Sequence, residues 1–219
     1  MYSQAEENYL KTIYALEKEY ENEVSTNLIA NKIRTKASSV TDMLKKLALK
    51  DLVVYKKYQG VYLTEAGRLT ALRVIRKHRL WECFLVQKLN FKWDEVHDIA
   101  EQLEHVKSEL LISKLDAFLR FPKLDPHGDP IPDEQGRIIK RKTMSIVEMD
   151  LGSSGTLVGV KDSSETFLKY LNKKNLGLGD KVKVIDIEPY DNSYHIETKT
   201  HRLVITSNVA ENLLIKNSK

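Results

Sequence analysis

The order of apolar patterns at the start of the chain constrains its fold more than any other sequence feature. Apolar residues recur at helical spacing over residues 4–20, which predicts a first helix. Ser25 or Thr26 can cap a short second helix that runs through Ile33. After a polar turn at 34–36, Ser38 and Ser39 are the candidate caps of a third helix ending near Leu49.

Two strand-like runs follow these helices. Residues 53–58 and 61–64 are rich in β-branched and aromatic side chains, and Gln59-Gly60 between them fits a tight hairpin turn. Helix, short helix, turn, helix and hairpin is the order of a winged helix-turn-helix. In that fold the third helix enters the major groove of double-stranded DNA and the hairpin touches the backbone.

The charge distribution agrees with this interpretation. The whole chain carries a formal net charge of only +4, but residues 32–73 hold ten Lys/Arg against three acids. Such a concentrated positive field suits a phosphate backbone, although any single lysine is more often an ordinary solubilising side chain. The expected DNA-binding residues are Lys36, Ser38, Ser39, Thr41, Asp42, Lys45, Lys46, Lys56, Lys57 and Tyr58.

Three further helices are expected after the hairpin. They cover residues 65–89, a segment around 97–105, and 107–121. Their apolar side chains exceed what so short a segment can bury alone. We therefore expect a homodimer, whose two-fold symmetry would match a palindromic operator.

The same region carries a stripe of imidazole and carboxylate groups. His78 and Glu82 are four residues apart, so they share a helical face. A second face is predicted to hold residues at i, i+4, i+7 and i+8, which are His97, Glu101, Glu104 and His105. The alternative is a solvated polar face, but the density of such pairs favours a divalent metal site. Mixed imidazole and carboxylate ligands suit manganese, iron or zinc better than calcium or copper(I).

The helical pattern ends at Pro122, and a different architecture is expected beyond it. A proline-rich linker over 125–132 precedes strand-like runs from Ser145 onward, and Val209–Ile215 reads as a terminal apolar turn. The predicted fold is mainly α with β. Its predicted parts are a winged helix-turn-helix domain at 1–72, a helical metal-binding and dimerisation domain at 73–143, and a small β-barrel domain at 144–219.

Composition and motifs narrow the class of protein. The chain has 219 residues, no apolar run long enough to span a bilayer and no signal-peptide pattern at its start, so a cytoplasmic protein without membrane contact is expected. The single cysteine, Cys83, excludes an intramolecular disulfide framework and reads as a core thiol. A metalloenzyme is the rival class, but neither His-Glu-x-x-His nor its inverted form occurs.

Taken in order, several motifs resemble the diphtheria toxin repressor and manganese transport regulator family of metal-dependent repressors. The resemblance covers essentially the whole chain. Its carriers are Glu7-Asn8-Tyr9-Leu10-Lys11-Thr12-Ile13-Tyr14, Ser38-Ser39-Val40-Thr41, Leu63-Thr64-Glu65-Ala66-Gly67-Arg68, Arg76-Lys77-His78-Arg79-Leu80-Trp81-Glu82, Glu101-Gln102-Leu103-Glu104-His105 and Pro126-His127-Gly128-Asp129-Pro130-Ile131-Pro132.

The resemblance implies two metal sites. The primary, regulatory site corresponds to Asn8, His78, Glu101, Glu104 and His105. The secondary site corresponds to Glu82, His97, Asp125 and His127, completed by a carboxylate of the last domain, Asp162 or else Glu165.

The resemblance also implies a function and a metal. Iron-type members have Cys at the position of Glu101, so this hard oxygen ligand favours Mn(II) as the cofactor, with Fe(II) as the alternative. Lys11 stands where some two-domain members use Glu to bind a second manganese ion. The implied function is a manganese-dependent repressor of metal-uptake genes that binds its operator as a metal-loaded dimer, with an iron-dependent repressor as the alternative.

Overall fold

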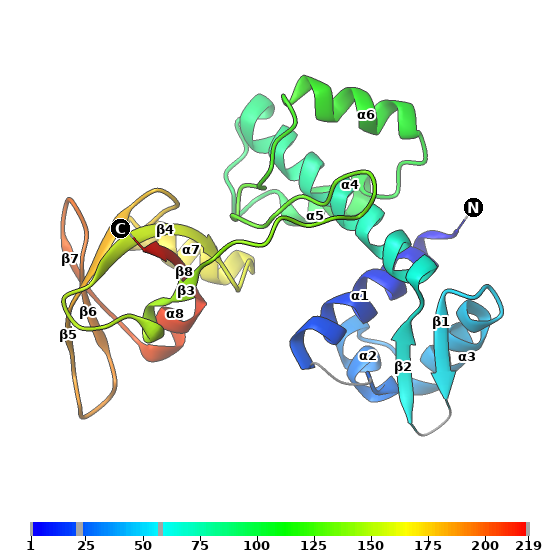
Figure 1. Ribbon diagram of the computed structural model, residues 1–219, viewed down its shortest axis with the longest axis horizontal. Helices are drawn as coiled ribbons and strands as arrows, with labels where there is room; N and C mark the ends of the chain where they lie inside the picture. The colour runs from blue at the N-terminus through cyan, green and yellow to red at the C-terminus, as the bar shows by residue number, and fades with distance from the viewer. Residues whose placement is uncertain (1, 21–23, 57–58, 218–219) are drawn as a thin grey trace. The chain divides into compact units, whose positions relative to one another are not determined.

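The structure is a computed structural model that describes residues 2–20, 24–56 and 59–217. The chain forms two compact units that interleave along the sequence (Figure 1). The first unit comprises Met1–Trp81, Glu101–Leu115 and Pro132–Ile138. The second comprises Glu82–Ala100, Asp116–Ile131 and Ile139–Lys219. Among the described residues, every helix is too short or too polar to cross a membrane.

The first unit begins with the expected winged helix-turn-helix. Its elements are α1 (Gln4–Tyr20), α2 (Thr26–Ile33), α3 (Ala37–Ala48), β1 (Val53–Lys56) and β2 (Gly60–Leu63). The two strands pair antiparallel, with Val53 opposite Leu63 and Lys56 opposite Gly60. Fully buried leucine and isoleucine side chains of α1 and α3 form its core, because each helix repeats them on one face.

Two local details of these helices bear on the sequence predictions. Ser25 caps α2 by accepting the N–H of Leu28, and Arg34 ends it in the left-handed conformation with a φ of 57°. The predicted caps of α3 are wrong. The helix begins before both serines, at Ala37, and Lys36 is its N-cap residue without a side-chain hydrogen bond.

Three helices follow, as expected: α4 (Glu65–Leu89), α5 (His97–Leu103) and α6 (Glu109–Phe118). The start of α4 is fixed by Thr64, whose hydroxyl accepts the N–H of Gly67 at 3.1 Å and donates to the carbonyl of Asp51 at 2.6 Å. The α5 helix is shorter than expected, because residues 104 and 105 form the turn that follows it.

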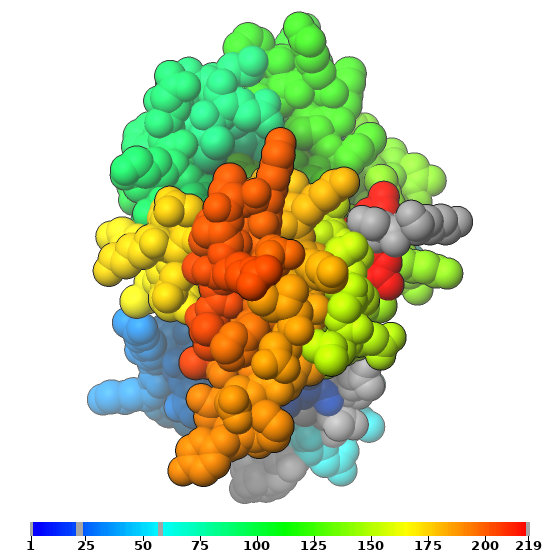
Figure 2. Space-filling view, turned by 90° about the vertical axis from the view of Figure 1, so that its left-hand side faces the viewer, coloured from blue at the N-terminus to red at the C-terminus, as the bar shows by residue number. Residues whose placement is uncertain are grey.

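The C-terminal part of the second unit is a single antiparallel sheet with two helices. Its strands are β3 (Met144–Ser145), β4 (Ser154–Val160), β5 (Lys181–Ile187), β6 (Tyr194–Glu197), β7 (Arg202–Ile205) and β8 (Leu213–Asn217). They are hydrogen-bonded in the order β3-β8-β4-β5-β6-β7. Figure 2 shows the segments of β5 to β7, in orange, at the surface of this unit.

The end of the chain differs from the sequence prediction. The run predicted as a terminal apolar turn is a helix, α8 (Ser207–Asn212), followed directly by β8. Strand β8 pairs with both β3 and β4, so the last strand closes the domain onto its first strands. The side chains of α7 (Glu165–Lys173) and α8 pack with the sheet in one core that includes Leu168, Leu171 and Val209.

We predict that replacing Gly67 by alanine destabilises the first unit. A Cβ atom at this position would lie 1.9 Å from the carbonyl oxygen of Leu52, so the hairpin and the start of α4 would have to move apart. We expect a loss of about 1–3 kcal/mol in the free energy of unfolding, measured by denaturant titration.

Gly177→Ala is the matched control for this substitution. No atom of the described residues lies within 4 Å of a Cβ built at Gly177, so this variant should unfold like the wild type. A Gly67→Ala protein as stable as the Gly177→Ala protein would contradict the close approach at Leu52.

Candidate metal centres

The first candidate centre lies wholly within the first unit. Helix α1 contributes Glu7 and Lys11, α4 contributes His78, and the end of α5 with its turn contributes Glu104 and His105. Each side chain reaches the cluster because α1 and α4 are long helices that present a polar face here while burying apolar residues elsewhere. Segments almost a hundred residues apart in sequence therefore meet through polar side chains.

Glu104 is the centre of this cluster. Its side chain is 1% exposed, and its Oε2 lies 2.6 Å from Nδ1 of His78 and 2.7 Å from Nζ of Lys11. Its other oxygen, Oε1, accepts a second hydrogen bond from Lys11 at 3.0 Å. Burial alone would raise the pKa of Glu104, but the hydrogen bond from His78 and the positive charge of Lys11 outweigh it and lower the pKa. The carboxylate is therefore held ionised.

A second histidine and a second carboxylate adjoin Glu104. Nδ1 of His105 lies 2.6 Å from Oε2 of Glu7, and its Nε2 lies 3.8 Å from Oε1 of Glu104. A carboxylate on one ring nitrogen fixes the imidazole's orientation and leaves the other nitrogen facing Glu104. Glu101 is 53% exposed and its Oε1 lies 3.5 Å from Nζ of Lys11. Asn8, on the same helix as Glu7, is exposed to solvent.

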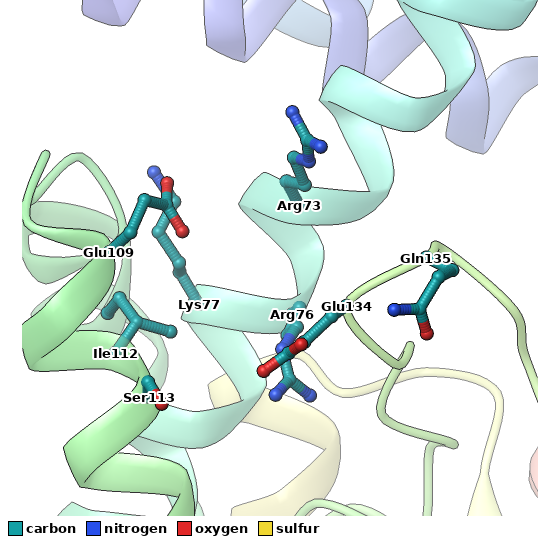
Figure 3. Close-up of a pocket in the computed structure, with 8 residues that line it drawn as sticks. All are labelled: Arg73, Arg76, Lys77, Glu109, Ile112, Ser113, Glu134 and Gln135. Carbon is teal, nitrogen blue, oxygen red and sulfur yellow. The ribbon is translucent and has the colours of Figure 1, made fainter.

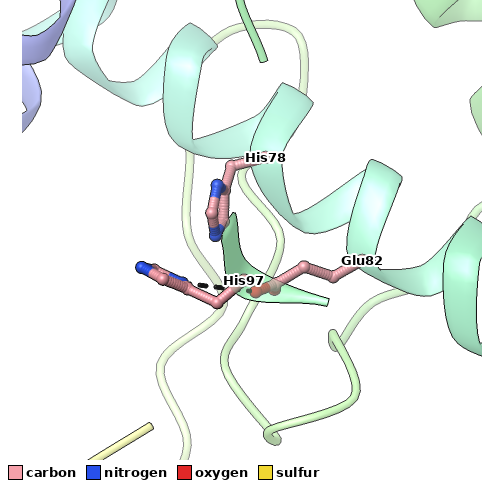
Figure 4. A group of neighbouring side chains, drawn as sticks. All are labelled: His78, Glu82 and His97. Atoms are coloured by element: carbon pink, nitrogen blue, oxygen red, sulfur yellow. Dashed lines mark ion pairs between the residues drawn. The ribbon is translucent and has the colours of Figure 1, made fainter. Parts of the chain in front are cut away.

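The second candidate centre lies wholly within the second unit. Glu82, Asp125 and His127 are all buried, and each offers a ligand atom within 4.8 Å of the others. The linker forms a tight loop here, in which the backbone N–H groups of His127 and Asp129 both donate to Oδ1 of Asp125. His97 approaches from α5, with Nδ1 at 3.8 Å from Oε1 of Glu82 (Figure 4).

His127 is tightly oriented in this second centre. Its Nδ1 lies 3.6 Å from Oε2 of Glu82, and its Nε2 lies 2.7 Å from the carbonyl of Trp93. Burial alone would lower the pKa of His127, but Glu82, Asp125 and the Trp93 carbonyl favour the protonated ring and raise the pKa to about 9. A cation bound by this imidazole has to replace that proton.

Three other acidic or thiol groups were candidates for this centre or lie beside it. Asp162 uses Oδ1 to accept the N–H of Ser164, and Glu165 pairs with Lys169 along α7. Among the residues that the structure describes, neither Asp162 nor Glu165 belongs to a group of three or more side chains close enough together to bind one metal ion. Cys83 is fully buried, and burial raises the pKa of its thiol, so it stays protonated and packs as a core residue.

The candidate DNA-binding residues gather on α3 and the hairpin. Lys36, Ser38, Ser39, Asp42, Lys45, Lys46 and Lys56 are exposed, and Thr41 is half-buried with its hydroxyl bonded to the carbonyl of Ala37. Lys57 and Tyr58 lie outside the described residues.

Lys46 also has a structural contact. Its Nζ lies 3.2 Å from Oε1 of the buried Glu6, and Lys50 lies 2.6 Å from the same oxygen. Burial would raise the pKa of Glu6, but these lysines and the N–H of Ser3 lower it to about 2. This pair of lysines therefore ties α3 and the turn after it to α1, besides adding to the positive surface.

The family models divide the chain into three matches. The model described as iron dependent repressor, N-terminal DNA binding domain, matches residues 1–61. Iron dependent repressor, metal binding and dimerisation domain, matches 64–133, and the FeoA domain matches 144–217.

Similar proteins carry both manganese and iron in their names. A solved structure titled manganese-dependent transcriptional repressor complex with manganese is 32% identical, with a TM-score of 0.87 over 97% of this chain and 100% of its own. The structure of the manganese regulator SloR is 35% identical, with a TM-score of 0.77 over 97% and 98%. The iron-dependent repressor IdeR of Mycobacterium tuberculosis is 36% identical over 126 residues, which are 58% of this chain and 54% of that repressor.

This chain belongs to the diphtheria toxin repressor family of metal-dependent transcriptional repressors. The chain matches about half the length of the curated IdeR sequences. The family is made of repressors, which sets the metalloenzyme alternative aside, and it supplies a DNA-binding domain, a dimerisation domain and a divalent metal as cofactor. The C-terminal sheet is its FeoA domain.

In this repressor, the predicted single stripe is divided between two clusters. Helix α5 ends at Leu103, so Glu104 and His105 leave the helical face that carries His97. His97 approaches Glu82, whereas Glu104 and His105 join His78, Glu7 and Lys11. Helical spacing alone put these four residues on one face, whereas the structure places them in two clusters.

The sequence analysis did not predict that Glu7 and Lys11 take part in the first cluster. Both lie on the same helix as the predicted ligand Asn8, and Glu7 and Lys11 are four residues apart. A Glu–Lys pair at that spacing reads as an ordinary surface pair on a helix, which hides its role.

A cavity of about 460 Å³ lies in the first unit (Figure 3). One wall is the face of α4 that carries Arg73, Arg76 and Lys77, and the facing loop carries Glu134 and Gln135. Arg76 donates from Nη1 to the carbonyl of Pro132 at 2.9 Å, so the basic wall also fastens the loop to α4. Its mixed charges give the cavity no clear ligand class.

We predict that metal-free protein loses stability as the pH rises from about 6.5 to about 9. Glu82 and the neighbouring acceptors raise the pKa of His127 from its ordinary value of 6.5 to about 9 in the folded protein. Its protonated form therefore stabilises the fold fully below the lower value and no longer above the higher one. Denaturant titrations of the metal-free protein at pH 6 and pH 9 measure this difference.

The substitution His127→Gln should remove most of this pH dependence, while His195→Gln on β6 should leave it in place. If the wild type and the His127→Gln protein lose the same stability between the two pH values, the charge on His127 is not its source.

Proposed function

We propose that this protein is a manganese-dependent regulator that represses metal-uptake genes and binds a palindromic operator as a metal-loaded homodimer. Fe(II) is the alternative cofactor. The observation that carries the proposal is the convergence of Glu104 and Glu101 on one position in the first unit, where the ammonium of Lys11 stands 2.7 Å and 3.5 Å from their oxygens. Two carboxylates that surround a cation are suited to receive a divalent metal ion.

The donor atoms support manganese over softer metals. The oxygens of Glu101 and Glu104 and the imidazoles of His78 and His105 form a set without sulfur. Hard oxygen ligands with imidazole suit Mn(II), whereas thiolate or thioether ligands favour softer ions. The similar structures that name manganese agree with this choice, and the family models that name iron keep Fe(II) in view.

The position of the first cluster suggests how a metal would act on DNA binding. Glu7 and Lys11 lie on α1, which packs with the DNA-reading helix α3 in one core. The other members lie on α4 and at the turn after α5. Glu101, Glu104, His78 and His105 would hold the metal, which would supply a dication in place of the Lys11 ammonium.

A bound metal would favour the arrangement of α1 in which the metal's ligands lie close together. DNA affinity then rises by as much as the metal prefers the DNA-binding arrangement over the others. The second cluster, with Glu82, Asp125 and His127, lies in the other unit and would bind a further ion that ties the linker to α4.

The test is selection of a randomised duplex pool with and without Mn(II), followed by anisotropy with Mn(II), Fe(II) and Zn(II). We predict recovery of a palindrome only with metal, bound most tightly with Mn(II). Binding should weaken steeply with salt, because basic side chains on α3 and the hairpin displace counterions from phosphates. Tightest binding with Fe(II) would establish the iron alternative, and metal-independent binding would make the clusters structural.

The substitution Glu101→Ala separates metal control from folding. Glu101 is half exposed, so its loss should not unfold the protein, but it removes a carboxylate from the first cluster. We expect the Mn(II)-induced gain in operator affinity to fall at least tenfold, which is about 1.4 kcal/mol. Glu211→Ala, an exposed acid on α8, is the control, and an unchanged response of the Glu101→Ala protein would contradict the proposal.

A further inference from the structure

Lys11 takes the place of a cation within the first cluster. Its Nζ contacts both oxygens of Glu104, at 2.7 Å and 3.0 Å, and lies 3.5 Å from Oε1 of Glu101. No ordinary surface pair on a helix has this geometry, since one ammonium is shared by two carboxylates from a segment ninety residues away along the chain.

We propose that Lys11 is a tethered competitor of the metal, an internal cation that holds Glu104 and Glu101 in the metal-free protein and has to leave when a metal ion binds. This inference rests on the proposed function of the same site. It assigns Lys11 a role in setting the metal concentration to which the repressor responds.

Glu104 is costly to leave without a positively charged partner. Its side chain is 1% exposed, and an ionised carboxylate buried to this degree is strongly destabilising unless it is paired. His78 donates one hydrogen bond, and Lys11 supplies a full positive charge. The ammonium therefore stabilises the metal-free arrangement of the cluster.

Lys11 and a metal ion cannot share the oxygens of Glu104. Carboxylate oxygens bind zinc at about 2.0–2.2 Å. A divalent ion bound comparably to Glu104 would lie close to an ammonium that itself contacts both Glu104 oxygens. The metal ion and the ammonium are both positive, and two such charges a short distance apart repel strongly in a site from which water is excluded.

Lys11 is able to leave. Its side chain is 22% exposed, so one side of it already reaches solvent. A lysine carries its charge on a flexible four-carbon stem, and a small rotation can take the ammonium to water while its methylenes remain packed. Glu104, by contrast, is fixed by burial and by His78.

Two consequences follow from this exchange. Metal affinity is lower than the ligand set alone would give, because binding includes the loss of the Lys11 contacts. The metal-free protein also keeps an ion-pair link between α1 and the turn after α5, the same elements that the metal would join.

The experiment compares full-length wild type with Lys11→Met, Lys11→Arg and Lys18→Met. Methionine keeps the length of the stem and removes the charge, whereas a glutamine could itself offer an oxygen to the metal. Lys18 is an exposed lysine of the same helix, with Nζ 5.0 Å from the Tyr14 ring, and serves as the matched control.

Free Mn(II) is followed by electron paramagnetic resonance during titration, and the sites of the first cluster are identified by their loss in Glu104→Gln. We expect the dissociation constant of these sites to fall at least tenfold in Lys11→Met. It should stay near the wild-type value in Lys11→Arg and Lys18→Met. An unchanged or higher constant in Lys11→Met would overturn the proposal.

Thermal unfolding gives a second readout that needs no DNA. Lys11→Met should melt below the wild type without metal, because Glu104 loses its cation, and should gain more from saturating Mn(II). An equal gain in both proteins would count against a competing lysine.

The two proposals fail in different ways. Suppose that the wild type binds Mn(II) and binds its operator only with metal, but that the Mn(II) dissociation constant is unchanged in Lys11→Met. This result would overturn only the proposal that Lys11 competes with the metal. If Glu104→Gln removes no Mn(II) site from the wild type or from Lys11→Met, the manganese function of the cluster fails as well.

Discussion

The buried carboxylate of Glu104 is the interaction on which the regulatory part of this structure depends. Burial makes its charge costly, so the fold has to bring positive or proton-donating groups to it, and it does so with Lys11 from α1 and His78 from α4. These contacts join the helix that begins the DNA-binding domain to the segment between α5 and α6. Because Glu104 has to be paired, elements that lie far apart in the sequence contact one another at this residue.

The second unit also contains buried carboxylates, and other groups compensate their charge. Glu82 and Asp125 are buried acids, and there the compensation comes from a protonated His127 and from backbone N–H groups of the linker. The first cluster therefore pairs its buried carboxylate with the Lys11 side chain, and the second pairs its buried acids with a proton on His127. A metal ion entering the second cluster competes with protons, so its affinity should depend on pH, whereas an ion entering the first cluster has to displace the Lys11 side chain.

Much of the fold could be predicted from the sequence because its signals are local and repetitive. Helical apolar patterns and the hairpin signal predicted the winged helix-turn-helix, and alternating apolar patterns predicted strands from Ser145 onward. The misses lie where several local signals compete. Ser38 and Ser39 are good capping residues, but α3 starts before them at Ala37, and the apolar run at the C-terminus is split between α8 and β8. Strand β8 forms only because β3 and β4 offer it partners, which no local pattern reveals.

Spacing alone predicted the candidate ligands as one stripe, whereas the resemblance to the family separated them into two sites. Spacing placed His97, Glu101, Glu104 and His105 on one helical face, and the end of α5 at Leu103 divides them. The parts played by Glu7 and Lys11 depend on contacts across about ninety residues or more of sequence, which spacing on α1 cannot show.

If metal at these clusters and DNA at α3 are coupled, the coupling has to be reciprocal, and this reciprocity can be measured. Mn(II) dissociation constants are measured by titration of the protein alone and of the protein saturated with the selected operator duplex. The account predicts that the operator tightens Mn(II) binding by the same factor by which Mn(II) tightens operator binding, at equal salt and pH. Identical Mn(II) affinity with and without the operator would contradict it.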